Sequence, residues 1–304
     1  MDLHPFLWMG CWNTRGTPRN AILDAVRDNA IANLVLAGDN VYPLKKDEPH
    51  QIAVFDEGIA GLGGKTIITS AFGNHNVKNA PMEAHQRAFF HRPADTPLYF
   101  CIEFNDVSLI VLDTNIMEDD AQRAEMAAFL TAQLAALPVG KPYYIVQHEP
   151  FASYKKTKDP ILPHGDEILR ILATKPPIAI LCADTHNYQE GTISVGSKEI
   201  RQIIVGTGGA AFDTYRHGLP PLVISAGAAA ATATATATAT PIVYTLDAEI
   251  SLPHYRQYGY YQMDAPGVGH FIEVMPWEGA GGGRRRTHKR TRKQRAIKRK
   301  NTRR

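Results

Sequence analysis

Short apolar runs alternate with longer amphipathic stretches along the first 215 residues. The runs are rich in Val, Ile and Leu, and in order they read "FLWMG", "NLVLAGDN", "KTIITSAFGNH", "YFCIEF", "VSLIVLDTN", "YYIVQHEP", "IAILCADTH" and "RQIIVGTGG". Runs this apolar are typical of strands buried on both faces, and the stretches between them are typical of helices. The pattern predicts an α/β protein with central strands.

One helix is clear from its periodicity. Apolar side chains recur on one face of residues 119–137, and Asp119 and Asp120 stand at the start, where acidic residues favour a helix. Further helices are expected at 20–32, 48–60, 81–90 and 164–174. Aromatic strand-like pieces, "HYRQYGYYQM" and "GHFIEVMPW", are expected to complete the sheet.

Two segments depart from this pattern. Residues 225–240 read "SAGAAAATATATATAT", with no charge and no large side chain, and we interpret them as a low-complexity surface insertion. Residues 281–304 begin with glycines and continue as a run of basic residues, which indicates a flexible hinge and a disordered tail. The sequence therefore predicts one folded domain over 1–280 that contains the insertion.

The formal net charge of +3 hides a division of charge along the chain. Of the 33 Lys and Arg residues, 13 lie in residues 284–304, which contain none of the 30 acidic residues. The rest of the chain therefore carries about −10 and the tail about +13 by side-chain count. A polycation without aromatic residues is typical of a segment that neutralises phosphates without reading sequence.

Composition excludes several classes of protein. The three cysteines, Cys11, Cys101 and Cys182, form no CxxC pair, so neither a zinc finger nor a disulfide framework is expected. No apolar run approaches the roughly 18 residues that a membrane span needs. The chain starts with "MDLHPF", which lacks the basic region of a signal peptide. We expect a soluble, intracellular protein.

Polar clusters follow four of the predicted strands. They read "LAGDNVY", "FGNHN", "VQHEP" and "CADTHNY". In open α/β sheets the carboxyl ends of the strands gather the ligand site, so these clusters are expected to face one crevice. Carboxylates, amide oxygens and imidazoles are ligands for Zn, Mn or Fe, and a bridging carboxylate can hold two cations about 3.5–4 Å apart. Such a pair suits phosphoryl transfer, because it neutralises ester oxygens and generates a hydroxide nucleophile.

The order of these clusters resembles the calcineurin-like metallophosphoesterases. The Tyr of "GDNVY" is similar to the purple acid phosphatase branch of that family, and the resemblance covers residues 5–215, including "LIVLDTN" and "VGTGGA". It implies a layered β-sandwich with flanking helices and two metal ions of Fe, Zn or Mn. The implied activity is hydrolysis of phosphate mono- or diesters by a hydroxide that bridges the metals.

The resemblance also implies roles for individual residues near the second metal. Asp39 would bridge the two metals, and Asn74 and His148 would bind the second. His75 would protonate the leaving alkoxide, which suits an imidazole near neutral pH. Where the family has Gly-His-x-His, this chain has Ala-Asp-Thr-His, so Asp184 would replace an imidazole as a ligand of the second metal.

At the first metal the resemblance implies two ligands and leaves one position altered. His186 and Tyr42 would bind this metal, Tyr42 as a phenolate that favours Fe(III). Cys11 stands where the family has an Asp, and Asn13 stands where many members carry a His. Cys11 is either a thiolate ligand or a small buried side chain, and Asn13 is either a weak ligand or a turn residue. His217 is the best candidate for a substitute ligand.

A second function remains open from sequence. The altered metal positions and the basic tail also fit a catalytically impaired phosphoesterase fold that binds nucleic acid non-specifically through residues 284–304. A nuclear-import signal and a segment that binds acidic membranes are competing interpretations of the tail. The tail and the Gly-Cys-Trp-Asn opening resemble family members from large DNA viruses, which makes nuclear and virion-associated locations alternatives.

Overall fold

The computed structural model describes residues 1–42, 50–155, 160–215, 219–224, 241–254 and 256–276. The predicted insertion at 225–240, the hinge and tail at 281–304, and His217 lie outside these residues. None of the described helices combines the length and the apolar character that crossing a bilayer requires.

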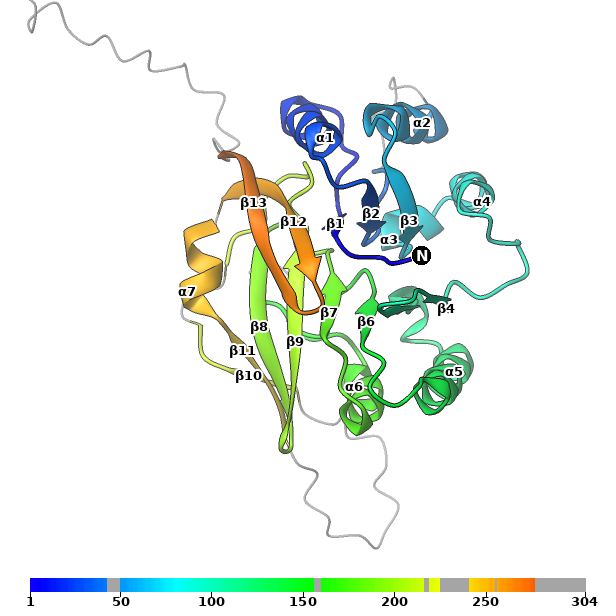
Figure 1. Ribbon diagram of the computed structural model, residues 1–304, viewed down its shortest axis with the longest axis vertical. Coiled ribbons are helices and arrows are strands. Elements are labelled where there is room, and N and C mark those ends of the chain that lie inside the picture. The colour runs from blue at the N-terminus through cyan, green and yellow to red at the C-terminus, as the bar shows by residue number, and fades with distance from the viewer. Residues whose placement is uncertain (43–49, 156–159, 216–218, 225–240, 255, 277–304) are drawn as a thin grey trace, which may run out of the picture.

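Two β-sheets pack face to face, and helices cover their outer faces (Figure 1). The smaller sheet has the strand order β13–β12–β1–β2–β3, and its strands β1, β2 and β3 are parallel. Its strands are β1 Phe6–Met9, β2 Asn33–Leu36, β3 Thr66–Ser70, β12 Gln257–Ala265 and β13 Val268–Pro276. The two aromatic pieces predicted to complete the sheet are β12 and β13.

The larger sheet has the order β10–β11–β8–β9–β7–β6–β5–β4, with β5, β6, β7 and β9 parallel at its centre. Its strands are β4 Phe100–Glu103, β5 Ser108–Val111, β6 Tyr143–Val146, β7 Ala179–Cys182, β8 Tyr188–Val195, β9 Lys198–Val205, β10 Leu222–Ile224 and β11 Ile242–Leu246. All eight apolar runs of the sequence contain one of the strands of these two sheets.

The described helices are α1 Thr17–Asp28, α2 Gln51–Gly61, α3 Asn74–Val77, α4 Ala80–Phe89, α5 Asp120–Ala136, α6 Gly165–Thr174 and α7 Ala248–Ser251, with short 3₁₀ turns at η1 Thr114–Ile116 and η2 Leu252–His254. Five of them, α1, α2, α4, α5 and α6, lie close to predicted positions, whereas the short helices α3 and α7 were not predicted. The helix expected over 20–32 ends at Asp28, so its predicted end was wrong. Asn29 is extended and its side chain accepts a hydrogen bond from the backbone of Ile31, which turns the chain into β2.

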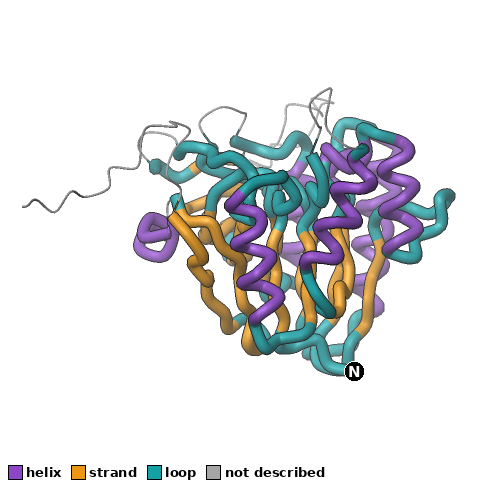
Figure 2. Tube along the Cα trace, turned by 90° about the horizontal axis from the view of Figure 1, so that it is seen from above, coloured by secondary structure: helices purple, strands orange, loops and turns teal. Residues whose placement is uncertain are grey.

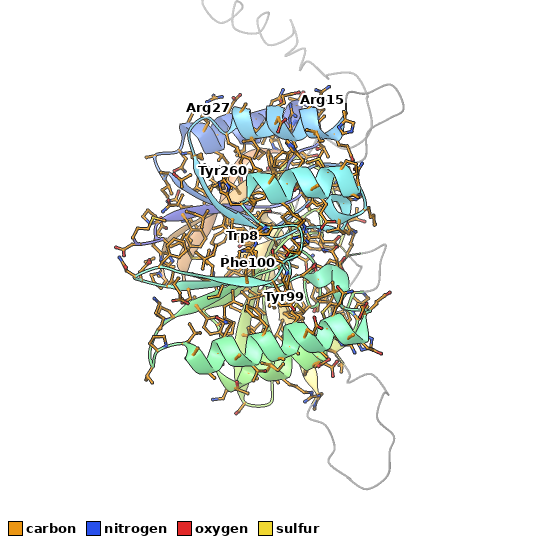
Figure 3. The ribbon with its side chains drawn as sticks, turned by 90° about the vertical axis from the view of Figure 1, so that its right-hand side faces the viewer. Trp8, Arg15, Arg27, Tyr99, Phe100 and Tyr260 are labelled. Carbon is orange, nitrogen blue, oxygen red and sulfur yellow. The ribbon has the colours of Figure 1, made fainter. Side chains whose placement is uncertain are left out.

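Two hydrophobic layers hold these elements together. One lies between the sheets, and the other lies between the larger sheet and helices α5 and α6. Along β6, Tyr144 and Val146 enter the first layer and Tyr143 and Ile145 enter the second, as the alternation of a strand requires. Figure 3 shows Trp8 in the interior between the sheets, whereas Arg15 and Arg27 lie on the outer surface.

The carboxyl ends of the parallel strands of both sheets meet at one end of the molecule. Figure 2 shows loops gathered at the end opposite the N-terminus. Backbone hydrogen bonds tie these ends together: Gly10 N–H donates to Val205 O across the two sheets at 3.0 Å, and Cys11 N–H donates to Gly38 O at 3.0 Å. The residues that follow β1 and β2 are thereby fixed beside those that follow β9.

Candidate metal centre

Three non-glycine residues adopt the left-handed backbone conformation directly after strands. Cys11 follows β1 with φ 52°, Asp39 follows β2 with φ 49°, and Asp184 follows β7 with φ 48°. This conformation is uncommon for residues with a Cβ, and it turns each chain sharply so that the side chain points across the strand ends. All three residues are members of the predicted metal site.

Two glycines allow the strand ends to approach. A Cβ on Gly38 would lie 2.6 Å from Nδ1 of His148, and a Cβ on Gly73 would overlap the carboxylate of Asp39. Gly38 also has φ 87°, a conformation that favours glycine. The Gly-Asp and Gly-Asn-His motifs therefore have a steric basis in addition to their polar residues.

The first group of donor atoms comes from three strand ends. Donor atoms of Cys11, Asp39 and His186 all lie within 4.8 Å of one another, as donors around one cation do. The hydroxyl of Tyr42 lies 3.0 Å from Nε2 of His186. His186 donates its Nδ1–H to Ala211 O at 2.7 Å, so Nε2 carries the lone pair that could bind a metal. These four residues are the predicted set for the first metal.

A second group lies on the other side of Asp39. Nε2 of the fully buried His148 is 3.4 Å from Oδ1 of Asp39 and 3.8 Å from Oδ1 of Asp184. Nδ1 of His148 is 2.7 Å from Ala37 O, an arrangement that leaves Nε2 facing the two carboxylates. Asp39 thus lies between the two groups, as a bridging ligand would.

Two donor atoms of the second group make no hydrogen bond within the described chain. Among the described residues, Nε2 of His148 and Oδ1 of Asn74 are buried side-chain atoms without a hydrogen bond. Buried polar atoms are normally satisfied, so these two atoms have the capacity to bind a metal ion. Oxygen and imidazole donors suit a first-row transition metal. The residues therefore fit the metals that the resemblance implies.

Electrostatics in the centre favour bound cations. Burial raises the pKa of the Cys11 thiol and the charge of Asp39 raises it further, so Cys11 is a neutral thiol unless a cation lies beside it. Burial alone would raise the pKa of Asp39, but the neighbouring His148 and His75 lower it to about 2. The anionic Asp39 in turn raises the pKa of His148 to about 9, against the effect of burial. A protonated His148 therefore balances the carboxylates when no metal does.

His75 lies at the edge of the centre with a side chain that makes no hydrogen bond within the described chain at Nδ1. Its backbone N–H donates to Oδ1 of Asp39 at 3.1 Å, and its ring packs against Tyr42 with ring centres 4.9 Å apart. Burial lowers its pKa below the usual histidine value. The imidazole is thus held next to the Asp39 carboxylate without a side-chain hydrogen bond to it.

A buried network joins the loops that carry these ligands. The indole N–H of Trp12 donates to Oδ1 of Asn40 at 2.9 Å, and the amide of Asn40 donates to Ser70 and Gln86 at 2.9 Å each. Oδ1 of Asn76 accepts from Gly73 N–H at 2.8 Å. The residues that follow Cys11, Asp39 and His75 in sequence are therefore the ones that position their loops.

The structure assigns Asn13 a different environment from the metal centre. Its amide donates to Val54 O at 3.0 Å and accepts from the Arg19 guanidinium at 3.2 Å. Both ends of the amide are used to join the β1 loop to α1 and α2. The interpretation of Asn13 as a structural residue is the one that fits.

Two charged residues near the centre were missed in the sequence. Lys155 and Asp213 form an ion pair at 3.0 Å, and Oδ2 of Asp213 also accepts from the backbone N–H of His186 at 2.9 Å. Asp213 follows β9, so its place after a strand was a usable signal. Lys155 lies in an irregular segment with no motif around it, and its neighbours in space are distant in sequence.

Comparisons with solved structures identify the fold. The purple acid phosphatase from yellow lupin (Lupinus luteus) seeds matches 90% of this chain and 52% of its own, with a TM-score of 0.63 and 12% sequence identity. A dimetal phosphatase from Danio rerio matches 73% of this chain and 95% of its own, with a TM-score of 0.55 and 12% identity. PhoD matches 90% of this chain and 72% of its own, with a TM-score of 0.50 and 11% sequence identity.

These likenesses confirm the predicted fold, a layered α/β architecture that this chain shares with the solved phosphatase structures. The chain spans about half the length of the lupin enzyme. No protein-family model and no curated protein sequence matches the chain. The fold is thus established by shape, and the activity must be argued from the site.

The close approach of Gly73 to Asp39 leads to a prediction. Gly73→Ala should displace the Asp39 carboxylate and weaken metal binding by roughly 10–100-fold, the usual effect of changes beside metal ligands. Metal titration of the purified variant, followed by calorimetry, measures this. Gly140→Asn, at an open position where a left-handed residue is tolerated, is the control. Unchanged metal affinity in Gly73→Ala would show that Asp39 is not a ligand.

Proposed function

We propose that this protein is a metal-dependent phosphoesterase that hydrolyses phosphate mono- or diesters. The observation that carries the proposal is the bridging position of Asp39 between two groups of donor atoms, Cys11 and His186 on one side and His148 and Asp184 on the other. A phosphate ester is the class of substrate whose charge and geometry such a centre suits. The similar solved structures from yellow lupin and Danio rerio are phosphatases, which supports the same conclusion.

In this proposal each ligand has one role. Asp39 would bind both of two metal ions of Fe, Zn or Mn; Cys11, Tyr42 and His186 would also hold the first, and Asn74, His148 and Asp184 the second. Two cations supply neutralisation of the ester oxygens and a hydroxide nucleophile near neutral pH.

The chain itself contributes orientation and a proton. Ala37 O and Ala211 O fix the rings of His148 and His186, so that neither imidazole turns away from the centre. His75, whose Nδ1 makes no hydrogen bond to the described chain, holds the proton that the leaving alkoxide takes up when its bond to phosphorus breaks.

Loss of the bridging ligand tests the activity. With added Mn, Zn or Fe, the protein is expected to hydrolyse an aryl phosphate, and Asp39→Asn or a chelator should abolish turnover because both remove the metals. His75→Ala should keep the metals and lower kcat by about 10²–10⁴-fold, the usual contribution of a general acid. Steady-state kinetics and elemental analysis measure both. Activity that survives Asp39→Asn and chelator would refute the assignment.

We also propose that Cys11 is a thiolate ligand of the first metal. Its left-handed backbone and its distance to Asp39 and His186 support this role over a purely hydrophobic one. A thiolate is a soft ligand that favours Zn or Fe over Mn or Mg, and a neighbouring cation would lower the pKa that burial raises.

The number of metal ions bound per chain distinguishes a ligand role of Cys11 from a packing role. Cys11→Ala should bind one metal fewer per chain than the wild type, and Cys11→Asp should bind two with a relative preference shifted toward Mn. Cys182→Ala, which removes a thiol equally buried in β7, is the matched control and should bind two. Two metals in Cys11→Ala would make Cys11 a packing residue.

The charge of the tail favours a second candidate function. Residues 284–304 carry 13 basic residues, and we propose that they bind DNA or RNA without sequence preference, either to bring substrate to an active centre or in a catalytically impaired protein. If the protein is catalytically impaired, we expect no turnover and at most one bound metal per chain.

Deletion of residues 284–304 tests this candidate. Binding of a labelled oligonucleotide, measured by fluorescence anisotropy, should be lost in the deletion variant and should weaken steeply with salt in the full chain. Hydrolysis of a small aryl phosphate should be unaffected by the deletion. A tail of equal length with its basic residues changed to Gln serves as the control for length. Binding that persists in both variants would rule out the tail as the binding segment.

A further inference from the structure

Lys155 places a buried ammonium group beside the candidate metal centre. Its side chain is only 7% exposed, and Nζ lies 3.0 Å from Oδ2 of Asp213 and 3.6 Å from Oδ2 of Asp184. Its backbone forms a bridge with Tyr215, which follows Asp213 closely in the chain. The position of this cation is therefore fixed by two carboxylates and by the backbone.

A lysine at this position works against metal binding. Burying an ammonium group costs solvation free energy, and its charge repels any cation that Asp184 or His186 holds. The pairing with Asp213 accounts for the burial of the ammonium group but not for its position beside the metal centre, 3.6 Å from Asp184. A fixed cation next to a cationic centre is instead what an anionic ligand requires.

A cavity of about 200 Å³ opens next to Lys155. Its walls include Asp184 of the centre, Ser153, Leu162 and Glu149, the residue after His148. This volume is below the roughly 300–1,000 Å³ of sites for drug-sized ligands, so the cavity suits a small group such as a phosphate. It adjoins the second group of donor atoms, where the phosphorus of a substrate would lie in the proposed function.

We propose that Lys155 binds the phosphate oxygens of the substrate in this cavity and makes the site selective for phosphate monoesters over diesters. The inference rests on the proposed function. Near neutral pH a monoester carries close to two negative charges, because its second pKa is about 6, whereas a diester carries one. An additional buried cation therefore stabilises the monoester more than the diester.

The carboxylates around Lys155 are compatible with this role. A cation held by Asp184 would take up the charge that this carboxylate shares with Lys155, and Asp213 would then be the main protein partner of the ammonium. An ammonium group has three donors: Asp213 Oδ2 accepts one at 3.0 Å, and the backbone O of Asp184 accepts a second at 3.4 Å. The third donor is the one that a phosphate oxygen would accept.

Paired substrates test the selectivity. With metal-loaded protein and a monoester and diester of the same aryl alcohol, Lys155→Met should lower kcat/KM for the monoester by about 10–100-fold, mainly through KM, as expected for loss of a hydrogen bond to a charged group. The diester should change by less than about threefold. Lys155→Arg, which keeps the charge, should recover part of the monoester activity.

Two binding measurements separate substrate recognition from a structural role. Calorimetry with inorganic phosphate should show weaker binding to metal-loaded Lys155→Met than to the wild type. Metal titration of the same variant should show unchanged or tighter binding, because a repelling charge has been removed. Weaker metal binding together with an equal loss for both substrates would mean that Lys155 only supports the centre, and the proposal would fail.

A second lysine provides the matched control. Lys175, at the end of α6, is partly buried and its Nζ donates to Leu137 O at 2.9 Å. Lys175→Met should leave the ratio of monoester to diester activity unchanged. If Lys155→Met does not fold, Lys155→Gln keeps a polar side chain and takes its place in every measurement.

The two proposals fail in different ways. A wild-type protein that hydrolyses no phosphate ester with any of the metals refutes the proposed function, while phosphate calorimetry still decides whether Lys155 binds the anion. A wild-type enzyme whose substrate ratio and phosphate affinity are unchanged by Lys155→Met retains the proposed function and overturns the role of Lys155.

Discussion

The contact between the Asp39 carboxylate and the His148 imidazole is the interaction on which the rest of the centre depends. Asp39 follows β2 of the smaller sheet and His148 follows β6 of the larger one, and the two groups lie 3.4 Å apart with both side chains buried. Neither group could be buried alone at low cost. The two sheets therefore meet at a point where opposite charge, supplied by a protonated histidine or by cations, is a condition of their packing.

The backbone around this contact is built to bring the side chains close. Because Gly38 and Gly73 have no Cβ, Asp39 and His148 can approach each other, and a Cβ on either glycine would clash with one of these side chains. The left-handed turns at Asp39 and Asp184 direct both carboxylates into the centre. Aspartate tolerates this conformation better than most residues, but cysteine has no such preference. The left-handed Cys11 thus occupies a turn suited to aspartate, which is the residue that the family resemblance implies there.

The sequence predicted the fold, and it predicted which polar residues gather at the strand ends, because both depend on local signals. Buried strands appear as apolar runs, and polar clusters at their ends give Asp39, Asn74, His148 and His186 in one order. Three strands of the larger sheet, β8, β10 and β11, went unpredicted because they alternate polar and apolar residues or flank the Ala/Thr segment. Lys155 could not be found, since its partners Asp184 and Asp213 are adjacent only after folding.

The charge of the centre connects its unusual residues. Cys11, Asp39 and Asp184 are each able to carry a negative charge, and with Tyr42 nearby the set is more anionic than one of imidazoles and amides. Such a set holds cations firmly but repels an anionic substrate once the cations are neutralised. A lysine fixed between Asp184 and Asp213 offsets that repulsion at the side where the cavity opens. Under the proposed function Asp184 and Lys155 therefore act together, because the carboxylate would favour the metal and the ammonium would favour the phosphate.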